Sequence, residues 1–159
     1  MALEPISFEI KGLKELEQEL LKLPDKIARR CLARAAAAGA RIVRDKAREN
    51  ARREFYSSAP DEKERPHTGE LAKAIRVRKK RTYNWRTTQI YGIGFIGKGW
   101  YGRLYEYGFK NPIGKRIQRA TIRPALDENA EQAANAVKEQ IEKEIMKIQI
   151  NGIARAKRH

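Results

Sequence analysis

Residues 92–97 have the spacing of a dinucleotide-binding loop, G-x-G-x-x-G, and Lys98 follows them. In a dinucleotide-binding fold these glycines follow a strand and open a long helix, and an acidic residue lies about 20 residues further on. In this chain the glycines alternate with apolar residues, as in a strand, and Arg116 stands near the position of the acid. A phosphate-binding loop needs Ser or Thr after its lysine to hold magnesium, but Gly99 follows Lys98. The motif therefore predicts a glycine-rich strand on which another backbone packs closely.

Three other groups of residues could do chemistry, and each has a simpler structural explanation. Cys31, the only cysteine, lies on the apolar stripe of a predicted helix, where a thiol is usually a small buried hydrophobic group. His67 precedes a Thr-Gly turn, where it can cap or bridge locally. The acids within residues 61–64 would suit a nuclease metal site, but they lie in a proline-bounded loop beside basic residues, as solvated charges do. No nucleophile, base and orienting group can be assigned to one site, so we expect no enzymatic activity, no metal and no cofactor.

Positive charge is concentrated in the middle of the chain. The 159 residues carry 35 Lys plus Arg and 20 Asp plus Glu, a net charge of +15. Residues 71–126 hold 14 of these basic residues and a single acid, Glu106, a net of +13. Such a segment indicates an anionic partner, which is nucleic acid, an acidic protein surface or an anionic membrane. Alternatively, the segment has no partner and is a solvated basic face that only aids solubility. No apolar run approaches the roughly 20 residues that span a bilayer, so we expect no membrane segment.

The first half of the chain predicts a strand and two helices. Apolar and polar residues alternate over residues 6–10, which is typical of a half-buried strand. Leucines recur at helical spacing over residues 13–23, and Pro24 interrupts this pattern. Pro24 suits the first turn of a second helix, which we expect from about Asp25 to about Phe55. The alanines before Gly39 form a smooth patch that allows a strand or a neighbouring subunit to come close. Residues 56–67 are polar with two prolines and predict a loop.

The basic segment predicts a short helix, a hairpin and a second short helix. Residues 68–71 start a turn of helix, and a strand follows from Ile75 whose alternation places three cations on one face: Arg76, Arg78 and Lys80. Residues 79–86 form a polar turn, and residues 88–95 return as the second strand. Residues 100–107 predict an aromatic helix that Gly108 ends.

A long helix completes the predicted domain. Ile122 leads into it, Pro124 lies in its first turn and Gly152 ends it. Its apolar stripe requires a partner, which is the sheet of the same subunit or a neighbouring subunit: Leu126, Ala130, Ala133, Val137, Ile141, Ile145 and Ile148. We therefore predict one α+β domain over residues 1–150, with long N-terminal and C-terminal helices on a small antiparallel sheet, and a basic tail over residues 151–159.

The lone acid of the basic segment requires an explanation of its own. Glu106 lies on the short aromatic helix, and an arginine such as Arg123 or Arg103 is the partner that we expect. A pair with Arg123 would tie the short helix to the start of the last one. The alternative is an exposed carboxylate that stabilises the fold by about 0 to 1 kcal/mol.

Three segments, in this order, resemble one protein family. A long alanine-rich helix precedes T-G-E-L at residues 68–71, then comes W-Y-x-x-L-x-E-x-G at residues 100–108, and I-R-P-A-L at residues 122–126 opens the last helix. Over residues 10–150 the chain resembles the head-tail joining, or tail completion, proteins of long-tailed bacteriophages and prophages. The positions that match are Thr68, Gly69, Leu71, Trp100, Tyr101, Leu104, Glu106, Gly108, Arg123, Pro124, Ala125 and Leu126.

The resemblance implies a structural protein of the virion, assembled in the cytoplasm of the bacterial host. It implies a ring of six copies at the head-tail junction that docks tail-tube and head-closure or connector proteins and leaves a channel for double-stranded DNA. In such a ring the face of Arg76, Arg78 and Lys80 is a candidate for contact with the DNA or with an acidic partner. Two other functions stay open at this point: a sequence-nonspecific nucleic-acid-binding protein, which would use the interleaved aromatics for stacking, and a small ribonuclease toxin.

Overall fold

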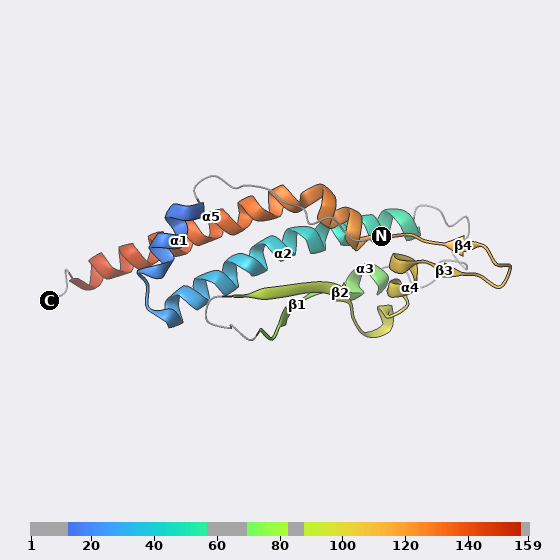
Figure 1. Cartoon of the computed structure of the whole chain (residues 1–159), viewed down its shortest axis with the longest axis horizontal. Coiled ribbons are helices and arrows are strands. Elements are labelled where there is room, and N and C mark those ends of the chain that lie inside the picture. The colour runs from blue at the N-terminus through green and yellow to red at the C-terminus, as the bar shows by residue number, and fades with distance from the viewer. Residues whose placement is uncertain (1–12, 57–69, 83–87, 157–159) are drawn as a thin grey trace. The chain divides into compact units, whose positions relative to one another are not determined.

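The computed structural model describes residues 13–56, 70–82 and 88–156 (Figure 1). The strand predicted over residues 6–10 lies outside the described residues, as does the predicted 56–67 loop beyond Tyr56. In chain order the elements are α1 (Leu13–Leu21), α2 (Asp25–Tyr56), α3 (Glu70–Ala74), β1 (Ile75–Lys80), β2 (Ile90–Phe95), the 3-10 turn η2 (Gly97–Gly99), α4 (Gly102–Tyr107), β3 (Phe109–Lys110), β4 (Arg116–Ile117) and α5 (Ile122–Ala156).

The fold is α+β, as the sequence predicts. Its described strands form two separate two-stranded sheets, β1 with β2 and an antiparallel β3 with β4. Contacts divide the chain into two compact units. Unit 1 comprises Met1–Gly39, Lys79–Tyr91 and Glu131–His159, and unit 2 comprises Ala40–Arg78 and Gly92–Ala130.

Unit 1 is held together by helix packing between α1, α2 and α5. Its core consists of Ala35 from α2 with Ile141 and Ile145 from α5, and the leucines of the α1 region pack against it: Leu16, Leu20 and Leu23. Gly39 of α2 allows α5 to approach closely, because a Cβ at this position would lie 2.8 Å from the Ala133 carbonyl oxygen and 2.7 Å from Val137 Cγ2. The smooth alanine-glycine patch therefore admits the backbone of α5, rather than the strand or second subunit that we expected.

An ion pair between the exposed side chain of Arg34 and the buried carboxylate of Glu144 joins α2 to α5 within unit 1. Arg34 donates to the Glu144 carboxylate at 2.6 Å, and Gln140 also donates to it at 3.2 Å. Burial by itself would raise the pKa of the Glu144 carboxyl, but the hydrogen bond and charge of Arg34, together with the charge of Lys147, hold that pKa below its ordinary value. Glu144 is therefore ionised and paired inside this helix contact.

Unit 2 contains buried apolar residues from each of its main elements. The apolar residues that are less than a tenth exposed come from α2, α3, β1, β2 and the start of α5: Val43, Ala47, Ala51, Leu71, Ala72, Ala74, Ile75, Phe95 and Ala125. The backbone of Ile96 donates to the Ala74 carbonyl at 2.9 Å, which closes α3 onto the end of β2. A Cβ at Gly99 would overlap the Ala74 Cβ, so only glycine fits this approach.

The last helix differs from its prediction at both ends. It continues through Gly152 to Ala156, so glycine does not end it. A single helical glycine costs about 1 kcal/mol, which the surrounding turns can offset. Near its start Asn129 leaves helical geometry at φ −121° and ψ 16°, and its amide donates to the Ala125 carbonyl at 2.9 Å. Before this kink Ala125 is buried, whereas Leu126, which was expected on the apolar stripe, is 46% exposed.

Candidate functional site

Strand β1 presents a row of exposed cations. Ile75 is fully buried at its start, whereas Arg76, Arg78 and Lys80 are exposed, in agreement with the predicted alternation. Lys79, which was assigned to a turn, belongs to the strand and is exposed too. The buried isoleucine fixes which side of the strand faces the core, so the arginines are held on the outer side.

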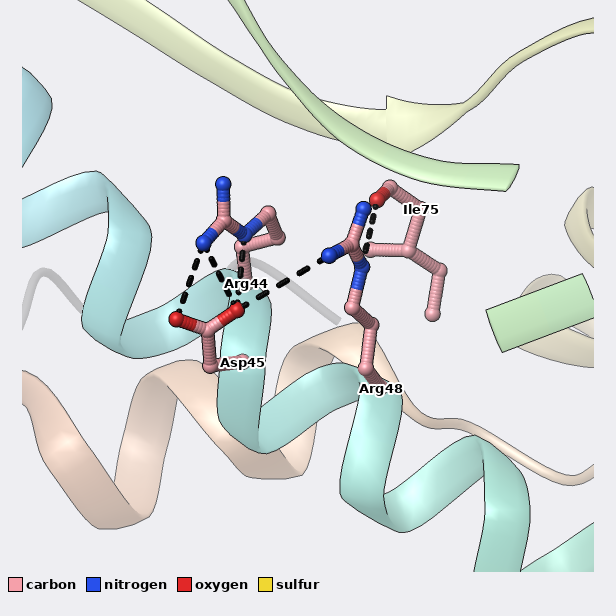
Figure 2. Close-up of polar contacts among 4 residues, drawn as sticks. All are labelled: Arg44, Asp45, Arg48 and Ile75. Carbon is pink, nitrogen blue, oxygen red and sulfur yellow. Dashed lines mark hydrogen bonds and ion pairs between the residues drawn. The ribbon is translucent and has the colours of Figure 1, made fainter. Parts of the chain in front are cut away.

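Arg48 of α2 contacts the same strand, and Asp45 links it to Arg44. Figure 2 shows Arg48 reaching the beginning of β1, where its Nε donates to the Ile75 carbonyl at 3.0 Å. Arg44 forms a two-pronged contact with Asp45 at 2.8 and 2.9 Å, and Arg48 lies 4.0 Å from the same carboxylate. Burial, followed by the charge of Arg44, lowers the pKa of Arg48, and Asp45 opposes this effect. The guanidinium stays charged at neutral pH, so this part of α2 adds to the positive field beside β1.

A second arrangement in unit 2 centres on the Glu106 carboxylate at the start of α5. It accepts the backbone N–H groups of Thr121 at 2.7 Å, Ile122 at 3.1 Å and Arg123 at 2.8 Å. The first four N–H groups of a helix have no acceptor within the helix, and the fourth position here is Pro124, which has no N–H. The Glu106 carboxylate therefore accepts the three free N–H groups at the start of α5, and at the fourth position Pro124 has no N–H that needs an acceptor.

Further contacts hold the segment before α5 against α4. The Arg119 backbone donates to the Tyr105 carbonyl at 2.9 Å, and Gln118 donates to the Glu106 carbonyl at 3.3 Å. From the other side, the Asn50 amide of α2 donates to the Thr121 carbonyl at 3.3 Å. The expectation that Glu106 ties the short helix to the last one is confirmed. Its partners among the described residues are backbone N–H groups and the Thr121 hydroxyl, rather than Arg123 or Arg103 side chains.

Helix α4 has an inner and an outer face. On the inner face Tyr105 contacts three aromatic rings edge to face: Phe55 at 4.9 Å, Phe109 at 5.3 Å and Tyr101 at 6.4 Å. A Cβ at Gly102 would lie 2.5 Å from the Phe95 ring, so this residue must be small. On the outer face Trp100 is 65%, Leu104 44% and Tyr107 69% exposed. The predicted end of the helix is confirmed, because Gly108 adopts φ 84° and donates its N–H to the Leu104 carbonyl.

Residues 14–108 match a family model described as "Bacteriophage HK97-gp10, putative tail-component". This match covers more than half of the 159 residues. The chain belongs to the HK97 gp10-like family of phage tail components. Comparisons with curated proteins and with solved structures find no match. The matched residues of this tail component include the motif at 100–108 but end before I-R-P-A-L at 122–126, which the resemblance also included.

Family membership makes the tail component a structural protein of the phage virion and not an enzyme. The candidate catalytic groups have structural surroundings that agree. Cys31 is buried, and burial followed by the charge of Glu144 raises the pKa of its thiol, so the thiol is protonated at neutral pH. Gly92 and Gly94 lie within β2, and the 3-10 turn η2 and the six-residue helix α4 follow, in place of the long helix that the glycines of a nucleotide site would open. In the described part of the chain no cluster of His, Cys, Asp and Glu could hold a metal ion, and no helix there is long and apolar enough to cross a membrane.

The residues of the resemblance lie in different environments of the tail component. Two of them are core residues, Leu71 and Ala125. Three lie where α4 connects to α5: Glu106, Gly108 and Pro124. Four are exposed: Trp100, Leu104, Arg123 and Leu126. Thr68, Gly69 and His67 lie outside the described residues. The group beside β1, Arg44, Asp45 and Arg48, was not predicted from the sequence, although arginines four residues apart on one helix were a usable signal.

Proposed function

We propose that this tail component completes the head-proximal end of the phage tail as a ring of six copies, joins the tail to the head and surrounds the path of the DNA. Its partners are further copies of itself, tail-tube proteins and head-closure or connector proteins. It acts in the virion at the head-tail junction, after assembly in the cytoplasm of the host.

The observation that carries the proposal is the exposed cation row of β1 in a protein of the phage tail. Arg76, Arg78 and Lys80 are exposed on a strand whose first residue is fully buried, and α2 places Arg48 beside that residue. A ring of six copies would bring together six of these rows of cations, and like charges repel unless an anion lies among them. The polyanion that passes a head-tail junction is the genome, so we assign the row to the channel.

The chemistry of the row suits transient contact with DNA. Guanidinium and ammonium groups bind phosphate without reading sequence, and they bind less tightly as salt rises. The DNA must slide past during ejection, so contacts to base edges would retard it. An acidic ring partner in the neck would satisfy the same cations, and the phenotype of a charge-reversed phage separates these two cases.

The test is a phage in which Arg76→Glu, Arg78→Glu and Lys80→Glu replace the three cations. We expect the chain to fold and particles to be made, with infectivity reduced by at least tenfold. Joined particles that fail to eject DNA would identify DNA as the partner, and unjoined heads and tails would identify an acidic protein. A matched variant with Lys26→Glu, Arg30→Glu and Arg41→Glu on exposed positions of α2 changes the charge equally and should leave infectivity intact. Normal infectivity of the β1 variant would contradict the proposal.

The alternative of a nucleic-acid-binding protein that stacks bases receives less support. It would use five aromatics for stacking: Tyr83, Trp85, Tyr91, Trp100 and Tyr101. The Tyr101 ring already packs edge to face against Tyr105 and Trp100, and the family is one of tail components. The ribonuclease alternative is not retained, because the family is one of tail components.

A further inference from the structure

We propose that the outer face of α4 binds a second copy of the chain through the acidic helix α1 of that copy. The face, which we call the α4 face, consists of Trp100, Leu104 and Tyr107. This inference rests on the proposed ring, since it names the surfaces by which neighbouring subunits meet.

The α4 face has the composition and spacing of a protein docking surface. Trp100 and Tyr101 already have helical backbone geometry, so residues 100, 104 and 107 recur at intervals of four and three and lie on one side. Their exposure of 65%, 44% and 69% leaves two large aromatics in solvent while Tyr105 fills the inner side. Trp and Tyr are the residues that most often dominate binding between proteins.

The charge around the α4 face selects an acidic partner. Lys98, Arg103 and Lys110 are exposed in or beside the helix. Glu106 is the only acid in residues 71–126, and the N-terminus of α5 takes up its carboxylate. The surface therefore combines apolar anchors with cations that form no ion pair among the described residues, and a partner that suits it supplies carboxylates beside an apolar side chain.

Helix α1 carries this complementary set on the same chain. Leu16 and Leu20 face the unit 1 core, whereas Glu15 and Glu17 are exposed and Leu21 is 76% exposed. Glu17 and Leu21 are four residues apart, so a carboxylate and an apolar side chain lie together on the outer side. Within the described residues none of the α1 glutamates forms an ion pair with Lys or Arg.

The other exposed apolar pair in unit 1 fits less well. Met146 and Ile150 are both 60% exposed on α5, but the acids near them are already paired, Glu142 with Lys138 and Glu139 with Lys143. Because α1 and the α4 face are different surfaces, their contact between copies is head-to-tail. Such contacts close into a ring when the rotation between copies allows it.

The test uses two charge-reversed forms of the full chain. The first has Lys98→Glu and Arg103→Glu, which makes both surfaces acidic, and the second has Glu15→Lys and Glu17→Lys, which makes both basic. We expect the wild-type chain to assemble, each variant alone to weaken assembly at least tenfold, and an equimolar mixture to assemble again with the two chains alternating. Light scattering after size exclusion measures the mass of the assemblies, and native mass spectrometry measures how many copies of each variant they contain.

A second pair of variants tests the apolar anchors. Trp100→Ser with Tyr107→Ser should abolish assembly with an unchanged circular dichroism spectrum, whereas Ile113→Ser at an 89% exposed turn residue should assemble normally. A wild-type chain that stays monomeric at all concentrations, or a mixture that assembles no better than its components, would overturn the inference. If the wild-type chain forms rings but the mixture of the two variants does not assemble, the proposed interface is refuted and the proposed ring is not. If the mixture of the two variants assembles but this chain is absent from the head-tail junction of the virion, the proposed function is refuted and the proposed interface is supported.

Discussion

The carboxylate of Glu106 does at the residue scale what a helix cap usually does with a neighbouring side chain. It comes from α4, more than a dozen residues before α5, and accepts three N–H groups that the helix itself cannot satisfy. Its negative charge also lies at the positive end of the helix dipole, which favours it there. The sequence pattern identified the residue and the two elements that it joins, but it predicted an arginine partner instead of the backbone N–H groups, because an unsatisfied backbone N–H has no signature in composition.

Replacement of this carboxylate should destabilise unit 2. We expect Glu106→Ala to lower the free energy of unfolding by about 2 to 3 kcal/mol, because three backbone N–H groups at the start of α5 lose a charged acceptor. Glu106→Gln keeps one acceptor oxygen and should cost about half as much. Urea unfolding followed by circular dichroism measures both, with Glu131→Ala on the exposed side of α5 as the control. Equal stability of Glu106→Ala and the control would refute the assignment.

Glu144 should make stability depend on pH. Its pKa in the folded chain is below the ordinary value, because the effects of Arg34 and Lys147 outweigh burial. Its stabilisation is therefore fully present above the unfolded pKa of about 4.3 and is lost as the pH falls through the folded pKa.

We expect Glu144→Gln to flatten the decrease in stability at acid pH. Urea midpoints measured between about pH 6 and pH 3 would show a smaller slope below about pH 4.3 than in the wild type. Glu139→Gln, at a carboxylate 66% exposed beside Lys143, is the matched control and should keep the wild-type slope. A wild-type slope in Glu144→Gln would show that another carboxylate sets the acid limit.

At the scale of elements, the contact between α2 and α5 in unit 1 depends on a small residue at position 39. A Cβ there would overlap the Ala133 carbonyl oxygen at 2.8 Å, and backbone yields less readily than a side chain. We expect Gly39→Ala to destabilise unit 1 by about 1 to 3 kcal/mol, although alanine favours an isolated helix. Thermal unfolding measures the change, and Gly94→Ala, where a Cβ meets nothing within 4 Å, is the control. A more stable Gly39→Ala chain would mean that the helices do not meet as described.

Sequence periodicity predicted the elements better than it predicted their partners. Leucine and alanine spacing located α1 and α2, and alternation located β1 with its buried Ile75 and exposed Arg76. The partner of α5 was open, since an apolar stripe specifies a face and not what covers it. The continuation of α5 through Gly152 and the kink at Asn129 were not predicted, because neighbouring turns and a side-chain amide override local propensity there.

At the scale of the whole molecule, charge and apolar surface have separate places in the chain. The cations of β1 lie on a strand fixed by a buried isoleucine, and the aromatics of α4 lie on a helix fixed by its inner tyrosines. In the proposed ring, the first surface faces the DNA path and the second contacts the next subunit. Sequence charge counts predicted the first of these surfaces, whereas the second needed the exposed fractions of Trp100 and Tyr107.

A cryo-electron microscopy reconstruction of the head-tail junction in the intact virion would decide whether this chain surrounds the DNA path. We predict a symmetric ring of this chain at the head-proximal end of the tail, with Arg76, Arg78 and Lys80 facing the channel. A junction built without this chain, or a ring whose β1 cations face bulk solvent on the outer rim, would contradict the proposed function.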